Sequence, residues 1–583
     1  MKEQPPQPAA PPSPDERDRR VLELYERVVE IEQRLIPTGL HVFGRAADAG
    51  ECADLLRMVA SFERPEHGAR ALPDLVAEGL GLGDFQSLLG GRDEETWRAR
   101  ERVDAVVRRA VAAFLGEGTE GACRLLAAEA RVDAAESEKI FRLLAQVRVH
   151  LETSRELDGL AKALRGEYVE PGPGADVVQN PGVLPTGRNT DAVNPYAVPS
   201  RTAFARAEGV VRLLLERHRS ERGRWPRAMA LVLWGLDNIK TQGEGVAQAL
   251  WLLGVRPVRD SLNRVTDVEP LPLERLGRPR IDVVMTVSGI FRDLFAPTMA
   301  LLDRAVRRVA ELDEPDESNG VRRNVREQME ADGCAFDEAA PRVFSNAPGS
   351  YGTNVNFMVM DSQWEQAEAL GDLFVTRKCF AYGRDREGRA VEGREARGAF
   401  VRALSRVEAA YQNIDSFEIG ITDVDHYFEY LGGVSRAVER HAEARPALYL
   451  SDATTREARV RSLAEMVRLE TRAKTLNPKW YEGMLSHGFR GVAEIESHLT
   501  NTFGWSATAD AVDEWVYREV AETFVLDREM IERLSRLNPH SARALVARLL
   551  EAQGRGFWRA EAEVLDRLRD IFAGLEDRIE GVT

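Results

Sequence analysis

The most constraining feature of this sequence is a repeated order of elements between residues 229 and 313. An apolar run at 230–234 is followed by a polar loop and a short apolar helix pattern. A second apolar run at 281–287 leads through a Ser-Gly pair into a long amphipathic helix. This order is typical of βαβ units on a parallel sheet. The sequence therefore predicts a parallel α/β core.

Polar residues cluster directly after the two predicted strands. In open parallel sheets, ligands bind beyond the carboxyl ends of the strands. The two loops are therefore expected to share one edge, where Asp237 and Glu244 are candidate catalytic groups. The amide, hydroxyl and cationic side chains are candidate substrate contacts. The residues of these loops are Asp237, Asn238, Lys240, Glu244, Ser288, Arg292 and Asp293.

The charge balance excludes one broad class of function. The chain carries a formal net charge of -16 and has a pI of about 5.3. A general nucleic-acid binder would present a basic face, so this composition argues against nucleic acid as a partner. Hydrophobic residues make up 44% and charged residues 30% of the 583 residues, as expected of a folded globular chain with several domains.

Cysteine usage and hydropathy predict a reduced, cytoplasmic protein. The four cysteines lie far apart and form no C-x-x-C pair, which argues against zinc ribbons and iron–sulfur sites. No apolar run approaches the roughly 20 residues that span a bilayer. Residues 1–14 are rich in proline and lack the apolar segment of a signal peptide.

The fold class predicted from these patterns is α/β and multidomain, with a parallel βαβ core flanked by largely helical regions. A long segment rich in proline and glycine between the helical N-terminal part and the core is expected to be an ordered loop. The expected divisions are a disordered Pro-rich tail at 1–18, a helical domain at 19–165, the ordered loop at 166–200, an α/β domain at 201–395 and a mostly helical domain at 396–583.

Two candidate groups lie near the end of the first predicted helix. His41 follows this helix in a turn, and imidazole is a common metal ligand and proton carrier. The alternative is a buried, hydrogen-bonded structural histidine. Glu30 is a candidate proton acceptor, although a carboxylate on a helix is more often a solvated surface group.

Two further segments carry candidate substrate contacts. Arg188 lies in the long loop beside Asn189, and its guanidinium can grip a substrate carboxylate through two hydrogen bonds. A structural role for this arginine is the equal alternative. Asn346 and Tyr351 lie in a Gly-containing loop after a predicted strand, which suits close backbone contact with a large flat ligand. A plain connecting turn would have the same composition.

A short acidic motif in the C-terminal region is a candidate metal site. Asp423, Asp425 and His426 place two carboxylates beside an imidazole. Such a group can bind Mg²⁺, which prefers a few carboxylates plus waters, or it can move protons. The alternative is the N-terminus of a helix that is capped by Thr422 or Asp423.

Several motifs of this chain resemble the large, porphyrin-binding subunit of magnesium chelatase and, more distantly, the large subunit of aerobic cobaltochelatase. Three of them, GWSAT, NPKWYEGM and EDRIEGV, lean toward the magnesium branch. The resemblance runs from about Val21 to Val582, and the family's subunit extends well beyond it, so this chain corresponds to the C-terminal half. The other motifs include EIEQRLIPTGLHVFG, LPTGRN, LVLWGLDNIKTQGEG, GRPRIDVVMTVSGIFRDLF and RVFSNAPGSYGTNVN.

The resemblance implies insertion of Mg²⁺ into protoporphyrin IX in (bacterio)chlorophyll biosynthesis, with Mg²⁺ as a substrate. It also implies partners: AAA+ motor subunits that hydrolyse ATP, and a separate N-terminal half. The chain contains no Gly-Lys pair and therefore no P-loop, which is consistent with ATP hydrolysis elsewhere. Pyrrole protons would pass to carboxylate or imidazole groups, and the candidates are Glu30, His41, Asp237, Glu244, Asp425 and His426.

Two alternative functions remain open from the sequence. The first is a cobaltochelatase large subunit that inserts Co²⁺ in cobalamin biosynthesis, which competition between metals and substrates would distinguish. The second is a non-catalytic tetrapyrrole-binding or scaffold relative. The family's missing N-terminal half favours this second alternative.

Overall fold

The computed structural model describes Ile31 and residues 39–90, 93–191, 193–385, 387–416, 418–442, 444–452 and 458–582. Glu30 and the predicted Pro-rich tail lie outside these residues. The chain divides into two compact units. The smaller unit contains His41–Glu170 and Asp176–Asn189, and the larger unit contains Pro171–Ala175 and the chain from Thr190 onward.

The described residues of the smaller unit are largely helical. Its core is formed by apolar faces of α2, α3, α5 and α6, with Leu56, Val76, Phe114 and Phe141 almost fully buried. The rings of Phe114 and Phe141 lie 5.4 Å apart between centroids. Its helices are α2 (Ala49–Ala60), α3 (Leu72–Gly79), α4 (Phe85–Gly90), α5 (Glu94–Ala130), α6 (Ala134–Leu151) and α7 (Glu156–Leu164).

The larger unit is built on an eight-stranded sheet with the order β12-β11-β10-β3-β6-β7-β8-β9. The strands from β11 to β7 run parallel, and the remaining strands pair antiparallel at the two ends. The strands are β3 (Ala228–Leu233), β6 (Asp282–Val287), β7 (Val343–Ser345), β8 (Phe380–Arg384), β9 (Ala390–Glu395), β10 (Ala409–Ile414), β11 (Ala447–Asp452) and β12 (Arg459–Ser462).

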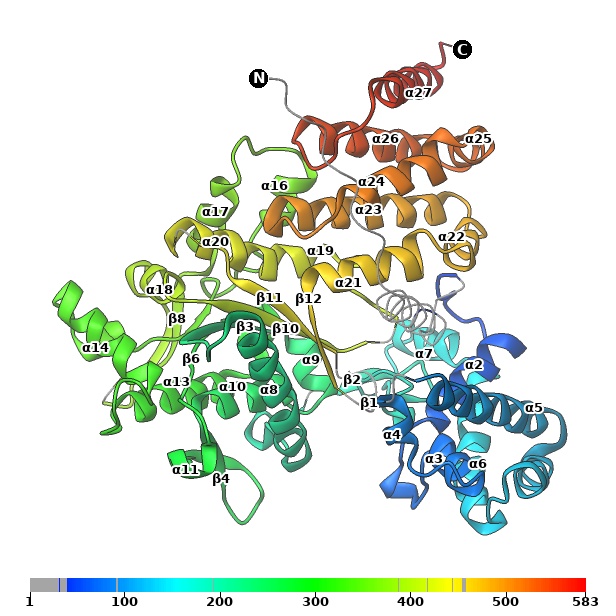
Figure 1. Cartoon of the computed structure of the whole chain (residues 1–583), viewed down its shortest axis with the longest axis horizontal. Coiled ribbons are helices and arrows are strands. Elements are labelled where there is room, and N and C mark those ends of the chain that lie inside the picture. The colour runs from blue at the N-terminus through cyan, green and yellow to red at the C-terminus, as the bar shows by residue number, and fades with distance from the viewer. Residues whose placement is uncertain are drawn as a thin grey trace, which may run out of the picture. The chain divides into compact units, whose positions relative to one another are not determined.

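The central strands are buried on both faces, which explains their sequences. Every residue of β3, β6 and β10 is buried. A parallel strand that is covered on both sides reads as a continuous apolar run rather than an alternating one. Helices cover the two faces of the sheet (Figure 1). They include α8 (Arg201–Arg222), α10 (Glu244–Leu253) and α13 (Ala296–Ala310) on one face, and α17 (Glu368–Lys378), α18 (Arg397–Leu404) and α20 (Gly433–Ala442) on the other.

Further helices pack beyond α20 at the C-terminal end of the chain. The longest of them, α23 (Phe489–Ala509), contacts both the π-helical segment η4 (Phe428–Gly432) and α26. Its face is lined by buried residues that include His498, Phe503 and Trp505. The others are α21 (Leu463–Glu470), the π-helical segment η5 (Thr471–Thr475), α22 (Pro478–Leu485), α24 (Glu514–Ala521), the π-helical segment η6 (Glu522–Leu526), α25 (Arg528–Leu537), α26 (Pro539–Gly554) and α27 (Ala562–Glu580).

The remaining elements are short. A hairpin of β4 (Val255–Arg259) and β5 (Val265–Pro270) extends from α10, and β1 (Pro171–Pro173) with β2 (Asn189–Asp191) forms a two-stranded sheet. The short helices are α9 (Gly235–Lys240), α11 (Leu273–Leu276), α12 (Gly289–Leu294), α15 (Phe336–Ala339), α16 (Val355–Met360) and α19 (Asp425–Tyr427), and α14 (Gly320–Asp332) is a longer exception.

The sheet crosses the domain boundary that the sequence predicts at 395/396. Strands β10, β11 and β12 come from the expected helical domain, yet β10 pairs directly with β3 in the middle of the sheet. Accordingly, the chain from Thr190 onward forms one unit. The sequence did not identify Ala409–Ile414 as a strand of this sheet. Periodicity alone does not distinguish a short buried strand from part of a buried helix.

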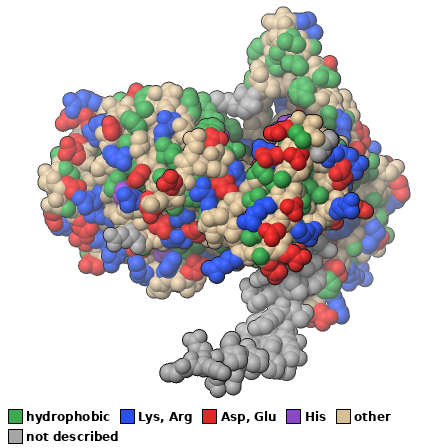
Figure 2. Space-filling view, turned by 90° about the horizontal axis from the view of Figure 1, so that it is seen from above, with side chains coloured by type: hydrophobic (Ala, Val, Ile, Leu, Met, Phe, Trp, Pro, Cys, Tyr) green, Lys and Arg blue, Asp and Glu red, His purple; other side chains and the backbone are tan. Residues whose placement is uncertain are grey.

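The surface carries both signs of charge. On the face drawn in Figure 2, acidic and basic side chains are interspersed over the described residues. No helix among these residues combines the length and the apolar character needed to cross a membrane. All four cysteines are free thiols.

Candidate functional site

A cavity of about 300 Å³ opens at the carboxyl ends of three neighbouring parallel strands, β3, β6 and β10. Its position is the one at which open α/β sheets bind ligands. The segments that follow these strands form much of its wall. The lining residues are Trp234, Gly235, Leu236, Asp237, Lys240, Ser288, Gly289, Ile290, Tyr351, Gly352, Asp415, Ile419, Val424, His426, Tyr427 and Tyr430.

A glycine and a serine hold the first two strand ends together. The Ser288 hydroxyl accepts hydrogen bonds from the backbone N–H groups of Phe291 and Gly235, each at 3.1 Å, so it caps α12 and joins it to the turn after β3. A Cβ atom on Gly235 would lie 2.5 Å from the Ile290 side chain. These contacts require glycine at the turn, because any side chain would separate the two segments.

Residues 235–240 form the short helix α9 instead of the polar loop that the sequence predicts. The Asn238 side chain donates to the Trp234 carbonyl at 2.8 Å and accepts from the Val246 N–H at 3.2 Å. Thr241 donates its hydroxyl proton to the Asp237 carbonyl at 2.7 Å. These side chains satisfy backbone groups between the two helices, and the predicted substrate contact Asn238 is therefore fully buried below the cavity.

The cavity floor brings acidic groups and one lysine together. The Lys240 ammonium lies 2.9 Å from the Asp415 carboxylate. Asp237 is buried and accepts a hydrogen bond from the Asn413 amide at 3.0 Å. Burial raises the pKa of Asp237 well above its usual range, and the nearby carboxylates of Asp415 and Glu244 raise this pKa further. Asp237 is thus held toward its neutral form, which suits a group that exchanges protons.

Aromatic side chains form one wall of the cavity. The Trp234 ring lies 5.7 Å from the Tyr427 ring and 4.6 Å from the Tyr430 ring, measured between centroids. Tyr427 donates to Asp415 at 3.4 Å. Burial, followed by the Asp415 charge, raises the pKa of Tyr427 well above its usual range, so this phenol stays neutral. The wall offers flat apolar surfaces with neutral hydroxyls behind them.

A buried lysine supports this wall from behind. The Lys378 ammonium donates to the Tyr430 hydroxyl at 2.8 Å, to the Asn346 side chain at 2.7 Å and to the Val287 carbonyl at 3.1 Å. Burial lowers the pKa of Lys378 well below its usual range. Asn346, a predicted substrate contact, is engaged in this network and in a 2.5 Å bond to the Gly352 carbonyl.

The Tyr351 loop forms the opposite wall. The Tyr351 hydroxyl donates to Asp293 at 2.5 Å, and the Arg292 guanidinium lies 5.0 Å from the centre of the Tyr351 ring. Arg292 also donates to the carbonyls of Ala347 and Ser350 at 3.0 and 2.7 Å. Arg292 and Asp293 line a second groove of about 650 Å³. The predicted substrate contacts Tyr351 and Arg292 thus separate two neighbouring hollows.

His426 lies in α19, just before η4, and lines the cavity. Its Nδ1 lies 2.8 Å from the buried Glu429 carboxylate, and this hydrogen bond raises the pKa of His426. Glu429 also accepts a hydrogen bond from the Asn354 N–H at 2.9 Å. π-Helical turns of this kind are frequent at functional sites, because the extra residue redirects neighbouring side chains. His426 is therefore positioned to carry a proton at the rim.

The three residues of the predicted metal site do not converge. Asp425 accepts a hydrogen bond from Asn356 at 2.6 Å, while Asp423 points toward Lys474 and His498. Within the described ranges, no group of three or more His, Cys, Asp and Glu side chains is arranged to hold a metal ion. The residues are adjacent in sequence, but Asp423 lies in the turn before α19 and Asp425 begins the helix, so their side chains diverge.

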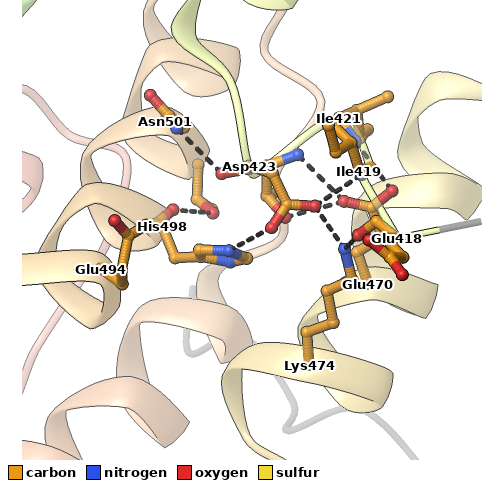
Figure 3. A network of polar contacts seen from close by, with 12 residues as sticks. Glu418, Ile419, Ile421, Asp423, Glu470, Lys474, Glu494, His498 and Asn501 are labelled. Carbon is orange, nitrogen blue, oxygen red and sulfur yellow. Dashed lines mark hydrogen bonds and ion pairs between the residues drawn. The ribbon is translucent and has the colours of Figure 1, made fainter. Parts of the chain in front are cut away.

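Asp423 instead belongs to a buried network that anchors the segment between β10 and α19 (Figure 3). Its carboxylate lies 2.6 Å from His498 Nε2, forms an ion pair with Lys474, and accepts the Gly420 N–H at 2.5 Å. Burial alone would raise the pKa of Asp423, but His498 and Lys474 lower it strongly. Lys474 lies in η5 and also donates to the Glu418 carbonyl at 2.6 Å.

A second carboxylate completes this network. Glu470 accepts hydrogen bonds from the N–H groups of Ile421 and Thr422, each at 2.9 Å, and from the Thr422 hydroxyl at 2.7 Å. Asn501 and Trp505 of α23 donate to the carbonyls of the same two residues at 2.9 Å. The segment that supplies Asp415, Ile419 and Val424 to the cavity is therefore tied to two helices.

Three predicted site residues lie in or at the edge of the smaller unit. His41 is exposed, and its Nε2 lies 3.0 Å from Glu156, which also accepts the Gly44 N–H at 2.6 Å. Arg188 donates to carbonyls of its own loop, including those of Pro185 and Val183 at 3.0 and 2.9 Å. Asn189 is exposed at the start of β2. His41 and Arg188 thus hold local loops together.

Sequence reasoning missed several groups of the site. Asp415 follows β10, and its place beside Asp237 depends on the insertion of that strand next to β3. The site also contains buried charged residues on helices, and hydrophobic periodicity does not predict that they are buried. They are Lys378, Glu429 and Glu470. An isolated acidic or basic residue within an otherwise apolar helical face is the one pattern that could have indicated them.

The sequence of this chain is similar to those of known metal chelatase subunits. The family model described as CobN/Magnesium Chelatase matches residues 3–565. The chain is 44% identical over 599 residues to the chloroplastic magnesium-chelatase subunit ChlH of Oryza sativa subsp. indica, covering 98% of this chain and 43% of the relative. It is 34% identical to the aerobic cobaltochelatase subunit CobN of Pseudomonas aeruginosa, covering 97% of this chain and 47% of the relative.

A solved structure shares the fold. The catalytic subunit of cobaltochelatase from Mycobacterium tuberculosis superimposes with a TM-score of 0.88 at 33% identity, covering 97% of this chain and 47% of that chain. The chain therefore spans less than half the length of the relatives it matches. The higher identity to the rice protein favours the magnesium branch over the cobalt branch.

Proposed function

This chain belongs to the CobN/magnesium chelatase family, and we propose that it is the C-terminal half of a porphyrin-handling large subunit that inserts Mg²⁺ into protoporphyrin IX. The product of this reaction would serve (bacterio)chlorophyll biosynthesis. The reaction class rests on the relatives, and the location of the chemistry rests on the cavity at the ends of β3, β6 and β10.

One observation carries this proposal. Asp237, Lys240, Ser288, Tyr351 and His426, which the sequence indicates independently, all line one cavity together with Trp234, Tyr427 and Tyr430. Apolar walls with a few convergent polar groups of shifted pKa are the usual composition of a small-molecule site. The aromatic wall would receive the face of a macrocycle by stacking.

Metal insertion requires two events that this site can support. Two pyrrole N–H protons must leave the macrocycle. Asp237 and His426 are candidates to take part in this transfer, because both line the cavity and the pKa of each is raised. Mg²⁺ must also lose water, which it does reluctantly, and carboxylate oxygens replace that water best. Asp425 beside His426 at the rim is the group we assign to this step.

The remaining candidates take other roles in this proposal. Asp423 is occupied by Lys474 and His498, so we assign it to holding the cavity segment in place. Ser288, Lys240 and Tyr351 would contact the substrate. Glu30, His41, Arg188 and Asn189 remain candidates for contacts in a larger assembly.

Partners are part of the proposal. ATP would be hydrolysed by AAA+ motor subunits, since the chain has no P-loop. A separate N-terminal half would supply the remainder of the subunit, because the relatives extend over more than twice the matched length. We propose that the assembly works in the cytoplasm.

A second candidate function is cobaltochelatase activity. The TM-score of 0.88 to the Mycobacterium tuberculosis subunit favours it specifically. The two candidates separate in a competition between Mg²⁺ with protoporphyrin IX and Co²⁺ with hydrogenobyrinic acid a,c-diamide. A non-catalytic tetrapyrrole carrier is the third candidate.

The proposal is tested by a fluorescence-quenching titration of the purified chain with protoporphyrin IX. Leu236 and Ile290 line the cavity and are 53% and 44% exposed, so L236D and I290D place a charge at its mouth without entering the core. We expect each to weaken porphyrin binding by about tenfold, because an unpaired carboxylate must be desolvated by the macrocycle.

The matched control is L262D, at a leucine that is 71% exposed on the β4–β5 turn outside the cavity. This variant should bind porphyrin as the unmodified chain does. Equal affinities for all three variants would place the porphyrin elsewhere. If the unmodified chain showed no quenching, alone or with the partner subunits, protoporphyrin IX would be the wrong substrate.

A further inference from the structure

A row of buried polar atoms without partners lies directly behind the cavity. Within the described chain, these atoms find no hydrogen-bond partner although their residues are at most 5% exposed. Buried polar groups are almost always paired, so a cluster of exceptions requires an explanation such as bound water or an ion. The atoms are Asp237 Oδ1, both carboxylate oxygens of Glu244, both side-chain amide atoms of Gln248, the Tyr411 hydroxyl and Asn413 Oδ1.

These atoms belong to side chains that lie close together. Asn413 donates to Asp237 at 3.0 Å, and Tyr411 precedes it by two residues on β10, so both side chains point to the same face of the sheet. Gln248 lies one turn after Glu244 on α10. The carboxylates of Asp237 and Glu244 interact electrostatically, as do Asp237 and Tyr411.

The row has one end at the cavity and the other near solvent. Asp237 lines the cavity. Glu244 lies 3.6 Å from the guanidinium of Arg206, whose side chain is 53% exposed on α8. Asp415 and Lys240 face Asp237 from the cavity side, and they are already paired with each other at 2.9 Å. The oxygens that accept no hydrogen bond therefore lie between the proposed reaction site and the protein surface, on a route that does not use the cavity mouth.

We propose that Asp237 and Glu244, with water bound between them to Gln248, Tyr411 and Asn413, form the path by which pyrrole protons leave the site. Water suits this space because each buried molecule needs two to four polar partners, which these atoms supply. The inference rests on the proposed function, since it assigns an exit to the protons that metal insertion releases.

Each proton transfer is balanced along this path. The pyrrole N–H bond breaks, its electron pair stays on nitrogen for the incoming metal, and the proton passes to the Asp237 carboxyl. Asp237 releases a proton toward water on the Glu244 side, Glu244 accepts it, and a solvent base beside Arg206 removes it. A macrocycle that fills the cavity would block direct proton loss to solvent, so a separate exit keeps the second proton from being trapped.

The first test is the rate of metal insertion by the full mixture of chain, N-terminal half, motor subunits, ATP and Mg²⁺. We expect E244Q to lower this rate by about tenfold or more while the affinity for protoporphyrin IX stays unchanged. The matched control is E208Q, at an exposed glutamate two residues after Arg206 on α8, which should retain the full rate.

Chemical rescue separates proton transfer from a structural role. Formate added to the E244A variant should restore much of the lost rate, because a small carboxylate can enter the vacated space and carry the proton. A structural defect would not respond to formate. An unchanged rate in E244Q, or a loss that formate does not reverse, would overturn the proposal.

A spectroscopic test reads the path without any activity. We expect the infrared spectrum of the chain at neutral pH to contain a protonated-carboxyl band that D237N removes and E244Q shifts. Absence of that band would overturn the proton path. Tight binding of Mg²⁺ alone that abolishes the band would instead show that the same oxygens hold a cation, and would equally overturn it. Because this test needs no porphyrin, it remains decisive even if protoporphyrin IX proves to be the wrong substrate.

Discussion

Two buried carboxylate clusters adjoin the end of β10, and they differ in how their oxygens are satisfied. In the network of Asp423 and Glu470, all four carboxylate oxygens accept hydrogen bonds from backbone or side-chain donors. In the cluster of Asp237 and Glu244, three of the four carboxylate oxygens accept no hydrogen bond within the described chain, although Glu244 lies 3.6 Å from Arg206. A buried network that is fully paired rigidifies its surroundings, whereas unpaired groups at a cavity remain available for chemistry.

The difference teaches how the molecule separates positioning from reaction. The paired network joins the turn before α19 to neighbouring helices and holds the segment that carries Asp415 into the cavity. The unpaired cluster lies where the chain passes from β3 to α10, and its polar atoms without hydrogen bonds lower the stability of the folded protein. Substitutions in the two clusters should therefore change different properties, and four experiments test that separation.

The largest effect is expected for E470A. This change removes the acceptor for two backbone N–H groups and one hydroxyl, all of them buried. Such a loss leaves donors unsatisfied, so we expect the free energy of unfolding to fall by about 3–5 kcal/mol. Chemical denaturation measures this, with E522A at an exposed glutamate as the control. A loss below about 1 kcal/mol would remove the distinction between the clusters.

The next effect is expected for D237N, and it should appear in activity. Loss of a proton-transferring group typically lowers a rate by about 10²–10⁴-fold, so metal insertion should fall within this range. At neutral pH the D237N variant should lose activity but gain stability. The folded-state pKa of Asp237 is raised, so its ionisation disfavours folding as pH rises above the unfolded value of about 3.9.

The D237N variant should therefore be more stable than the unmodified chain at pH 8, by about 1.4 kcal/mol for each unit by which that pKa is raised. The difference should vanish below about pH 4, where the carboxyl is protonated in both states. Thermal unfolding across this pH range measures the change. A variant that is less stable at pH 8 would show that Asp237 is ionised and paired in the folded chain.

A smaller effect of opposite sign is expected for D423N. The pKa of Asp423 is lowered by His498 and Lys474, so this carboxylate contributes stability above the unfolded pKa of about 3.9 and loses it as pH falls toward the folded value. We expect D423N to cost about 2–3 kcal/mol at pH 7 and progressively less as pH falls below about 3.9 toward the lowered folded-state pKa. A cost that is independent of pH would mean that the amide packs poorly and that charge is not the cause.

The smallest effect compares two fully buried tyrosines. The Tyr517 hydroxyl lies 2.6 Å from the Ser506 hydroxyl, whereas the Tyr411 hydroxyl has no partner among the described residues. We expect Y517F to cost about 1 kcal/mol and Y411F to change stability by less than about 0.5 kcal/mol. If Tyr411 contributes to the proton path, Y411F should still slow metal insertion several-fold. If Y411F and Y517F lowered the free energy of unfolding equally, the Tyr411 hydroxyl would have to be hydrogen-bonded like the Tyr517 hydroxyl.

The sequence predicted the part of the site that depends on local order. Asp237, Lys240 and Ser288 follow apolar strands, and the rule that ligands bind at strand ends placed them at one edge of the sheet. Asp415 could not be placed there, because nothing local indicates that the strand before it inserts between β3 and β11. The divergence of Asp423 from Asp425 likewise depends on a helix start that lies between them.

Other residues were recognised by type but not by role. Asn238 and Asn346 are polar residues of the right loops, yet each satisfies buried backbone or lysine groups instead of facing the cavity. Sequence patterns show which residues can form hydrogen bonds, while the partner depends on packing that the complete fold determines. Three-dimensional contacts also revealed the aromatic wall, because Trp234 reads in sequence only as the end of an apolar run.

The position of β10 beside β3 has a consequence for biosynthesis. During translation, β3 emerges long before β10, because all residues between Leu233 and Ala409 must be made first. At about 5–20 residues per second, one apolar edge of β3 waits roughly 10–35 s for its neighbour. An unpaired apolar strand invites association with other chains. The nascent protein should therefore depend on chaperones during this interval, and its cavity can form only after the C-terminal helices begin to appear.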